Sequence, residues 1–339
     1  MDLVTQGIAG AALAQAVAPS PLGRQAALVG LCAGLLPDAD ALISSAADPL
    51  LQLEYHRHFT HALVFVPLGS LFAATLFWPF FRGRMLFRTL WLFAVCGYAT
   101  GGVLDACTSY GTHLFWPFSS EPIAFSLIAI VDPVFSLALA MPLGIGLRRM
   151  KPMRIGLVFA VSYLLFGAVQ HERAADMARQ VAGERNHEPR QAIVKPTLAN
   201  LLLWRSVYTV GDSVYVDALY LGEPSRVYTG GGVHLLNPQR DVSWAPDGSR
   251  VRDDLRRFSR FARGFVVASE REPHFVGDVR YAMLPQSLEP LWGLYTDSAD
   301  PNAATRYEQR RSFTPALRDS FLTVSYTHLR AHETTGSRV

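Results

Sequence analysis

The chain has 339 residues, half of them apolar, and they include 20 Phe and 6 Trp. Residues 1–170 contain 17 of the 59 Asp, Glu, Lys and Arg residues, whereas residues 171–339 contain 42. About a quarter of a soluble domain is charged, so the second half is ordinary and the first half is too poor in charge. This composition excludes a disordered chain, a collagen-like chain and a disulfide-rich mini-protein. It predicts a membrane-embedded half followed by a water-facing half.

The net charge of +3 is nearly balanced, and no run of five or more like charges occurs. Nothing here indicates a basic surface for nucleic acid, so no nucleic-acid partner is expected. The three cysteines all lie in the apolar half, which gives no disulfide framework. No charged segment precedes the first apolar run, which argues against a cleaved signal peptide. The first apolar run is therefore expected to act as the membrane signal.

Five or six apolar runs lie in the first half, at about residues 3–18, 22–37, 62–81, 86–104, 133–147 and 154–169. Only the third and fourth approach the ~20 residues that a full bilayer crossing needs. The other runs suit short helices in a partly sunken or interfacial bundle. The predicted fold is an all-α membrane helical bundle of five to six short helices over residues 1–170.

The connections between these runs differ in charge. Those after the first, third and fifth runs carry only bases: Arg24, Arg82, Arg84, Arg88, Arg148, Arg149, Lys151 and Arg154. Those after the second and fourth carry acids and the single base Arg57. Lys and Arg accumulate in short cytoplasmic loops. Residues 38–61, 105–132 and everything after about 170 are therefore expected on the far side of the membrane.

The second half changes from helical to β texture. Residues 171–195 read as a polar helix and linker. Residues 196–322 contain β-branched and aromatic segments separated by glycine-containing turns, which predicts a small antiparallel β-rich domain outside the cytoplasm. This domain has no catalytic motif, and its protein partner is unknown. Residues 323–339 fit no amphipathic pattern and are expected to be a non-native or disordered tail.

Seven side chains with metal-ligand chemistry lie at the run ends on the predicted far side: Asp38, Asp40, His56, His58, His61, Asp105 and Asp132. Carboxylates and imidazoles suit Zn²⁺, Mn²⁺ or Fe²⁺, and a hydrolytic site needs three or four of them with an open position. The sequence therefore predicts a divalent metal, zinc first, bound by Asp38, Asp40, His56, His61 and Asp105.

Simpler interpretations compete at single positions. Asp38 alone could be a helix cap, and Asp132 before Pro133 is an N-cap and first-turn signal. The histidine trio could be an interfacial anchor or a pH sensor. Asp105 is the strongest single case, because an unpaired carboxylate in an apolar helix end is costly and tends to be functional.

The spacing of the histidines leaves their geometry open. His56 and His61 are five residues apart, about 140° around a helix, so they converge only if the chain turns between them. His58 and His61 are three apart and could share a helical face.

The surrounding residues suggest further roles. Trp116 and Phe118 fit headgroup-level anchors, with contact to a lipid substrate as the alternative. Arg57 either offsets the carboxylates or contacts a phosphate-like oxyanion. Asp40, Arg57 and His113 are the candidates for catalytic roles.

The chain starts with MDLVTQG (1–7) and contains four further motifs: GLLPDAD (34–40), HRHFTHAL (56–63), LDACTSYGTHLFWPFSS (104–120) and VDP (131–133). Together they resemble the YdjM-like family of bacterial inner-membrane proteins, predicted metal-dependent hydrolases, over about residues 1–150. The resemblance implies a multi-pass protein of the inner (cytoplasmic) membrane with a metal site built from these His and Asp residues. It also implies a distant similarity to all-helical zinc-dependent phospholipases and nucleases.

The family's LPDxD falls on Leu36 to Asp40, its HRGxTH on His56 to His61, and its motif Asp on Asp105. Many members have His at the positions of Gln6 and Gly101, and His58 replaces a usual Gly. Either the site holds fewer metals, or His58 and His113 compensate, or catalysis has been lost.

Three functions are compared. The first is a membrane-bound metal-dependent hydrolase of an ester or phosphoester, with a lipid as a natural substrate. In it, Asp38, His56, His61 and Asp105 hold one or two metals, Asp40 binds metal or acts as base, and Arg57 steadies negative charge. The second is a non-catalytic membrane protein with a structural metal site and a partner-binding β domain. A proton- or metal-coupled transporter ranks last, because the acids lie at one face rather than at the midplane.

Overall fold

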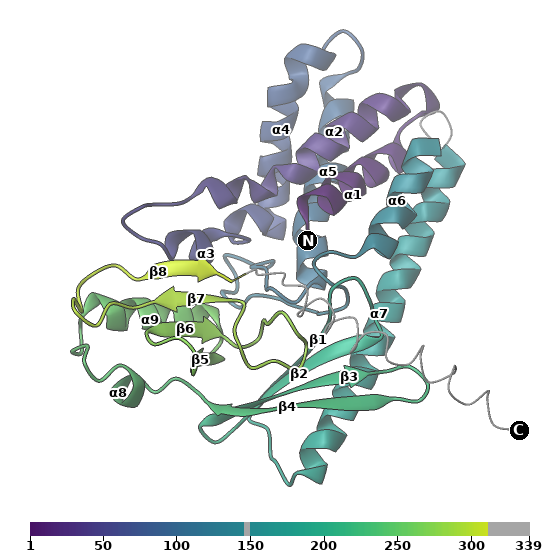
Figure 1. Cartoon of the computed structure of the whole chain (residues 1–339). Helices are drawn as coiled ribbons and strands as arrows, with labels where there is room; N and C mark the ends of the chain where they lie inside the picture. Colours follow the sequence, from purple (N-terminus) through teal and green to yellow (C-terminus); the bar gives the residue numbers. More distant parts are fainter. Residues whose placement is uncertain (146–149, 311–339) are drawn as a thin grey trace, which may run out of the picture. The chain divides into compact units, whose positions relative to one another are not determined.

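The computed structural model describes residues 1–145 and 150–310, and the chain divides into two compact units (Figure 1). Unit 1 comprises Met1–Ser45, Leu51–Glu172 and Lys195–Leu201. Unit 2 comprises Ala46–Leu50, Arg173–Val194 and the described residues from Leu202 onward. A helical region with several apolar helices is followed by a small β domain, so the predicted fold class is confirmed. The predicted tail at 323–339 lies outside the described residues.

The helical region contains one helix for each apolar run of the sequence. Its long helices are α1 (Leu3–Val17), α2 (Gly23–Leu35), α4 (Val66–Phe81), α5 (Phe87–Cys107), α6 (Pro133–Ile145) and α7 (Met150–Glu184), and α3 (Leu51–Tyr55) is short. The sixth run and the polar segment after it form the single helix α7, because neither Pro nor a cap signal interrupts residues 171–184.

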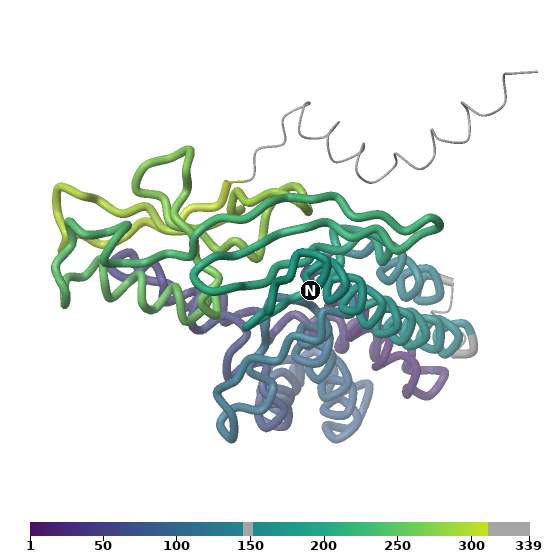
Figure 2. Tube along the Cα trace, turned by 90° about the horizontal axis from the view of Figure 1, so that it is seen from below, coloured from purple at the N-terminus to yellow at the C-terminus, as the bar shows by residue number. Residues whose placement is uncertain are grey.

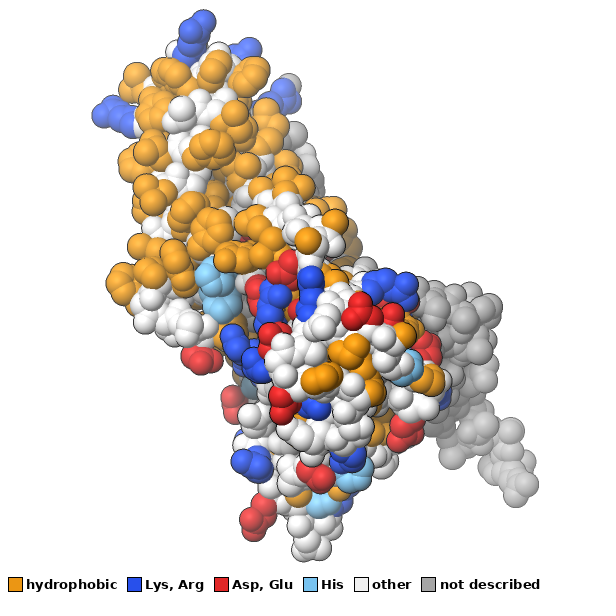
Figure 3. All heavy atoms as spheres, turned by 90° about the vertical axis from the view of Figure 1, so that its left-hand side faces the viewer, with side chains coloured by type: hydrophobic (Ala, Val, Ile, Leu, Met, Phe, Trp, Pro, Cys, Tyr) orange, Lys and Arg blue, Asp and Glu red, His pale blue; other side chains and the backbone are white. Residues whose placement is uncertain are grey.

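Among the described residues, four helical segments are long and apolar enough to cross a membrane: Ser20–Leu42, Leu63–Phe81, Phe87–Cys107 and Pro152–Glu184. The expectation that only the third and fourth runs have this length was too narrow. Short 3₁₀ turns extend α2 at both ends, and α7 continues beyond its apolar part. Exposed apolar side chains cover the helical unit, with basic side chains gathered at one end of this surface (Figure 3). That distribution fits helices in contact with lipid.

Three helices of unit 1 cross at glycines. A Cβ added to Gly10 of α1 would lie 2.4 Å from the Gly30 carbonyl oxygen of α2, and one added to Gly97 of α5 would lie 2.3 Å from the same oxygen. Only glycine permits this approach, as in other membrane helix pairs. The crossing fixes the three helices closely enough for side chains nearer their ends, among them Gln6 and Asp105, to meet.

The β domain, as described to residue 310, has two four-stranded antiparallel sheets, ordered β1-β2-β3-β4 and β5-β6-β7-β8. The strands of the first sheet are Gln191–Pro196, Leu203–Val210, Ser213–Tyr220 and Arg226–His234; those of the second are Val266–Ala268, Phe275–Asp278, Trp292–Tyr295 and Arg306–Gln309. β2, β3 and β4 lie side by side (Figures 1 and 2). The predicted Gly211-Asp212 turn joins β2 to β3, with Gly211 at φ +59°. β1 starts at Gln191, a few residues before the predicted boundary at 196.

The two sheets share a buried core, to which Val207, Val216 and Val267 contribute. Helices α8 (Pro238–Asp241) and α9 (Arg250–Phe261) lie between the sheets in sequence. Arg205 of β2 is 3 % exposed and donates to five backbone carbonyls of residues 279–287. Its guanidinium thus holds this loop against the first sheet, and burial lowers the pKa of Arg205 to about 9.

Candidate metal centre

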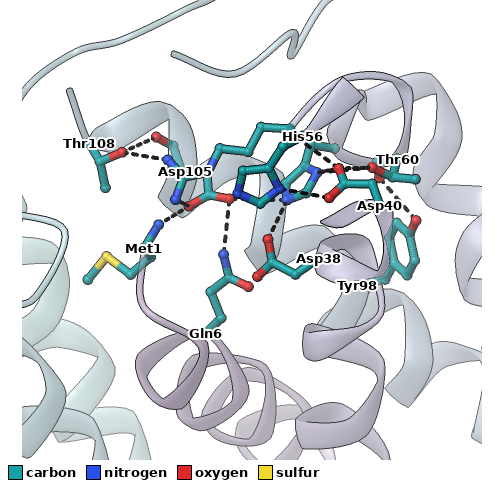
Figure 4. A network of polar contacts seen from close by, with 11 residues as sticks. Met1, Gln6, Asp38, Asp40, His56, Thr60, Tyr98, Asp105 and Thr108 are labelled. Atoms are coloured by element: carbon teal, nitrogen blue, oxygen red, sulfur yellow. Dashed lines mark hydrogen bonds and ion pairs between the residues drawn. The ribbon is translucent and has the colours of Figure 1, made fainter. Parts of the chain in front are cut away.

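The polar side chains of unit 1 converge where three segments end. Pro37 starts a 3₁₀ turn, Pro37–Leu42, directly after α2, and this turn carries Asp38 and Asp40. A second 3₁₀ turn, Phe59–His61, carries His61, and Asp105 belongs to the last turn of α5. Figure 4 shows the labelled Asp38, Asp40 and Asp105 side chains gathered around one place. Helix ends and short turns therefore bring residues from three parts of the chain to one place.

A glycine sets the position of His61. A Cβ on Gly102 of α5 would lie 2.2 Å from the His61 carbonyl oxygen. Because residue 102 lacks a side chain, the turn that carries His61 can pack directly on α5. The His61 ring therefore reaches Asp105, which lies on the next turn of the same helix.

The first group of candidate ligands is Asp38, His61 and Asp105, whose ligand atoms lie within 4.8 Å of one another. His61 Nε2 lies 3.3 Å from Asp38 Oδ1 and 3.1 Å from Asp105 Oδ2. Nε2 is buried and its contacts to these two carboxylates are ion pairs, with no hydrogen bond among the described residues. Buried polar nitrogens are normally satisfied. An imidazole nitrogen between two carboxylates without a hydrogen bond is a donor arrangement that fits a divalent cation.

The second group is Asp38, Asp40 and His56, again with ligand atoms within 4.8 Å. His56 Nδ1 lies 2.8 Å from Asp40 Oδ1. Asp38 belongs to both groups. Each group offers three ligands of the carboxylate and imidazole type that zinc, manganese and iron accept. The arrangement therefore suits one divalent cation or two neighbouring cations that share Asp38.

Buried donors hold the carboxylates in place. Asp40 Oδ2 accepts hydrogen bonds from the Arg57 backbone NH (2.8 Å) and the Thr60 hydroxyl (2.7 Å). Asp105 Oδ2 accepts from Gln6 Nε2 at 3.0 Å, and the Met1 amino group contacts Asp105 Oδ1 (Figure 4). Such outer hydrogen bonds orient carboxylate ligands and tune their affinity.

Arg57 supports the site from inside the protein. Its guanidinium lies 3.2 Å from Asp105 Oδ1 and donates to the Thr108 hydroxyl at 3.3 Å. It also lies over the Tyr110 ring, 4.8 Å from the ring centroid, and the residue is 4 % exposed. Of the two predicted roles, these contacts favour charge offset over contact with a substrate oxyanion. The three carboxylates of the site still outweigh this one guanidinium by two charges.

The structure answers the question of histidine spacing. Arg57 has a left-handed φ of +62°, so the chain turns directly after His56, and the His56 and His61 ring centroids come within 6.3 Å. His58 instead packs against His113, with ring centroids 4.5 Å apart, and against Trp116. Neither His58 nor His113 belongs to the two ligand groups found among the described residues. The proposed compensation of missing ligands by these two rings therefore finds no support in this geometry.

Asp132 also lies outside these groups. Its Oδ1 accepts a hydrogen bond from the Phe135 backbone NH, and its Oδ2 accepts one from the Tyr163 hydroxyl. Asp132 therefore caps the N-terminus of α6, as the N-cap interpretation of the sequence predicts. At the position of one family histidine, Gln6 still contacts Asp105. At the other, Gly101 packs toward Pro37, since an added Cβ would lie 3.0 Å from Pro37 Cγ.

Three contributors were not predicted as site residues: Gln6, Thr60 and Thr108. Their contacts depend on the fold, although Thr60 lies inside the HRHFTH segment and Thr108 directly follows α5. A polar residue inside an otherwise apolar run, as Gln6 is, was the available signal.

The electrostatics centre on His61, which lies between two candidate spans. Burial disfavours its charged form, but the carboxylates of Asp105, Asp38 and Asp40 outweigh burial and raise the pKa of His61 to about 10. Without a metal, this imidazole therefore carries a proton at neutral pH. A bound cation would compete with that proton for the ring nitrogen.

These features define a multi-pass membrane protein with a candidate His/Asp metal centre. The family model described as "YdjM inner membrane protein" matches residues 1–174, and the chain belongs to this family. The resemblance noted from the motifs is thus confirmed.

Two curated relatives match the chain. The uncharacterized protein YfhP of Bacillus subtilis (strain 168) is 24% identical over 266 residues, which are 77% of each chain. The inner membrane protein YbcI of Escherichia coli (strain K12) is 33% identical over 98 residues, 27% of this chain and 53% of YbcI. No solved structure matches. Together with the four candidate spans, the family and these names support an inner-membrane protein.

Proposed function

We propose that this protein is a membrane-bound, metal-dependent hydrolase of an ester or phosphoester. The observation that carries the proposal is the pair of three-ligand groups that share Asp38, one completed by His61 and Asp105 and the other by Asp40 and His56. Zinc is the metal we expect, with manganese and iron as alternatives. A divalent cation supplies Lewis acidity and an activated water for hydrolysis.

The residues of the chain have separate roles in this proposal. The metal ligands are Asp38, Asp40, His56, His61 and Asp105. Asp40 Oδ2 already accepts two hydrogen bonds, so the ligand role suits Asp40 better than the alternative role of general base.

Arg57 and Gln6 are positioning residues, because Arg57 forms an ion pair with Asp105 and Gln6 donates a hydrogen bond to it. The three carboxylates and Arg57 leave a net charge of −2, so two bound divalent cations would make the site positive. A positive site favours an anionic substrate such as a phosphodiester. His113 keeps its predicted catalytic role only as a hypothesis, since its ring packs on His58.

We also propose that the site and unit 2 face the extracytoplasmic side of the inner membrane. Arg88 and Asp105 belong to the start and end of α5, roughly 25 Å apart along the helix. The exposed Arg82 and Arg84 precede the start of α5. Bases mark cytoplasmic ends, so the acidic end would face outward. A cysteine-accessibility experiment with a membrane-impermeant reagent on spheroplasts, at an introduced Gly83→Cys and an introduced Asp247→Cys, tests the two sides.

Metal analysis of the purified full-length protein tests the hydrolase proposal. We expect bound divalent metal, its loss in a His61→Ala plus Asp105→Ala variant, and metal-dependent turnover of bis(p-nitrophenyl) phosphate. A wild-type protein without divalent metal, or unchanged metal in the double variant, would contradict the proposal.

The replacement of two family histidines by Gln6 and Gly101 favours a second candidate, a non-catalytic membrane protein with a structural metal and a partner-binding β domain. Bound metal, together with ester turnover that His61→Ala leaves unaltered, would support this second candidate.

A further inference from the structure

An apolar groove opens in the side of the helical unit. Residues of α1, α5, α6 and α7 line it, among them Ala9, Leu13, Thr100, Leu139, Ala160 and Leu164. Its volume is about 240 Å³, more than the ~150 Å³ of an apolar cavity that can hold benzene. Thr100 is a polar residue of this lining, and its hydroxyl donates to the Gly97 carbonyl of its own helix. The groove therefore offers hydrocarbon contacts rather than hydrogen bonds.

The groove has a buried floor and an exposed rim. Phe135 and Leu139 of the floor are each 1 % exposed, whereas Val103 and Val161 of the rim are 45 % and 57 % exposed. Both rim residues belong to candidate membrane spans. The opening thus faces the surface that contacts lipid tails.

Two of the four helices, α1 and α5, connect the groove to the candidate metal centre. Ala9 lies one helical turn after Gln6, which donates to Asp105, and Leu104 directly precedes Asp105. Phe135 lies near the start of α6, and Leu164 lies next to Tyr163 of α7. α1 and α5 therefore link the groove to the metal centre, through Gln6 and Asp105.

Polar side chains lie at this end of the groove. The Thr5 and Ser136 hydroxyls are 2.6 Å apart, and Ser136 donates to the Asp132 carbonyl. The Tyr163 hydroxyl donates to the Asp132 carboxylate. The helices thus change from apolar to polar to acidic over a few turns, the order in which a lipid presents its chain, its ester region and its headgroup.

We propose that this groove holds one hydrocarbon chain of a membrane lipid and that the lipid's headgroup ester or phosphoester is thereby presented to the metal centre. The clause on presentation rests on the proposed hydrolase function; the binding of the chain does not. The rim belongs to candidate membrane spans, so a lipid chain is the apolar molecule that surrounds the groove in a bilayer. Since lipid tails are as apolar as the lining, the groove would bind a lipid chain only weakly but would orient the lipid that occupies it.

Photolabelling tests the proposal. The full-length protein in lipid nanodiscs receives phosphatidylglycerol with a diazirine midway along one acyl chain, and labelled peptides are located by mass spectrometry. We expect labels on the lining of α1, α5, α6 and α7. A Val161→Trp substitution on the rim should cause loss of this labelling. Val158→Trp is the matched control, because Val158 is 66 % exposed on the same helix and does not line the groove.

A Leu13→Trp substitution, which fills the groove from α1, serves as the second variant if Val161→Trp does not fold. Labels spread evenly over the exposed residues of α4 and α7, or unchanged labelling in a folded filled variant, would overturn the proposal. The same samples are assayed for metal and for turnover of bis(p-nitrophenyl) phosphate, which has no hydrocarbon chain. Metal and turnover without groove labelling would reject the groove alone, whereas groove labelling without metal or turnover would reject the hydrolase alone.

Discussion

Replacement of Asp38 by Asn is the sharpest perturbation of the candidate metal centre. Asp38 belongs to both three-ligand groups, whereas His61 and His56 belong to one each. The substitution keeps the size of the side chain and one carbonyl oxygen but removes the negative charge. We therefore expect Asp38→Asn to weaken metal binding at both groups and His56→Ala to weaken it at one.

The magnitude follows from the role of the residue. Loss of an outer hydrogen-bond partner of a ligand already costs ~10–100-fold in metal affinity. Loss of the charge of a ligand itself should therefore exceed ~100-fold, about 2.7 kcal/mol of binding free energy. His61 Nε2 lies 3.3 Å from Asp38 Oδ1, so this carboxylate is also part of what holds the His61 ring at the site.

The assay is elemental analysis of dialysed full-length protein, followed by titration against a chelator of known affinity. Asp132→Asn is the control, because Asp132 is a buried carboxylate that caps α6 outside both groups. Full metal content in Asp38→Asn, or equal losses in Asp38→Asn and Asp132→Asn, would refute the shared-ligand geometry. A wild-type protein with one metal that His56→Ala leaves in place would refute the second group.

Three further predictions follow from the same structure. Because the pKa of His61 is raised to about 10, its contribution to metal-free stability is full below pH 6.5 and is lost as the pH rises through about 10. Zn²⁺ binding at pH 7 should therefore release a proton, which calorimetry in two buffers of different ionisation enthalpy detects. A binding enthalpy that does not depend on the buffer would refute this prediction. Gly102→Ala should destabilise the protein by about 1–3 kcal/mol and weaken metal binding, since its Cβ would meet the His61 carbonyl oxygen at 2.2 Å. The control is Gly83→Ala, whose Cβ would have nothing within 4 Å, and it should leave thermal unfolding and metal content unchanged. Arg205→Leu should expose unit 2 to limited proteolysis because loss of its hydrogen bonds costs about 1–3 kcal/mol for each buried carbonyl left unsatisfied, while metal content stays at the wild-type level.

The histidine spacing illustrates the limit of sequence reasoning here. In a continuous helix His56 and His61 would lie about 140° apart, whereas His58 and His61 could share a face, so the sequence left their geometry open. One left-handed residue, Arg57, reverses this arrangement, and such a φ in a non-glycine residue has no sequence signal. The tertiary structure thus brings His56 close to His61 and turns His58 toward His113.

The sequence by itself determined the helical membrane half, the β half and the family, because apolar runs, turn residues and short motifs are local features. It also named all five candidate ligands, since carboxylates and imidazoles at the ends of apolar runs are conspicuous and costly. The inward or outward orientation stays a prediction from loop charges.

Only the tertiary structure decided which of these residues meet and what supports them. Convergence depends on the approach of three helices at glycines such as Gly30 and on the packing of the His61 turn against Gly102. The support from Gln6 and Arg57 and the sharing of Asp38 depend on the same contacts. These are distances between segments far apart in sequence, and steric fit between backbones fixes them rather than any local pattern of residues.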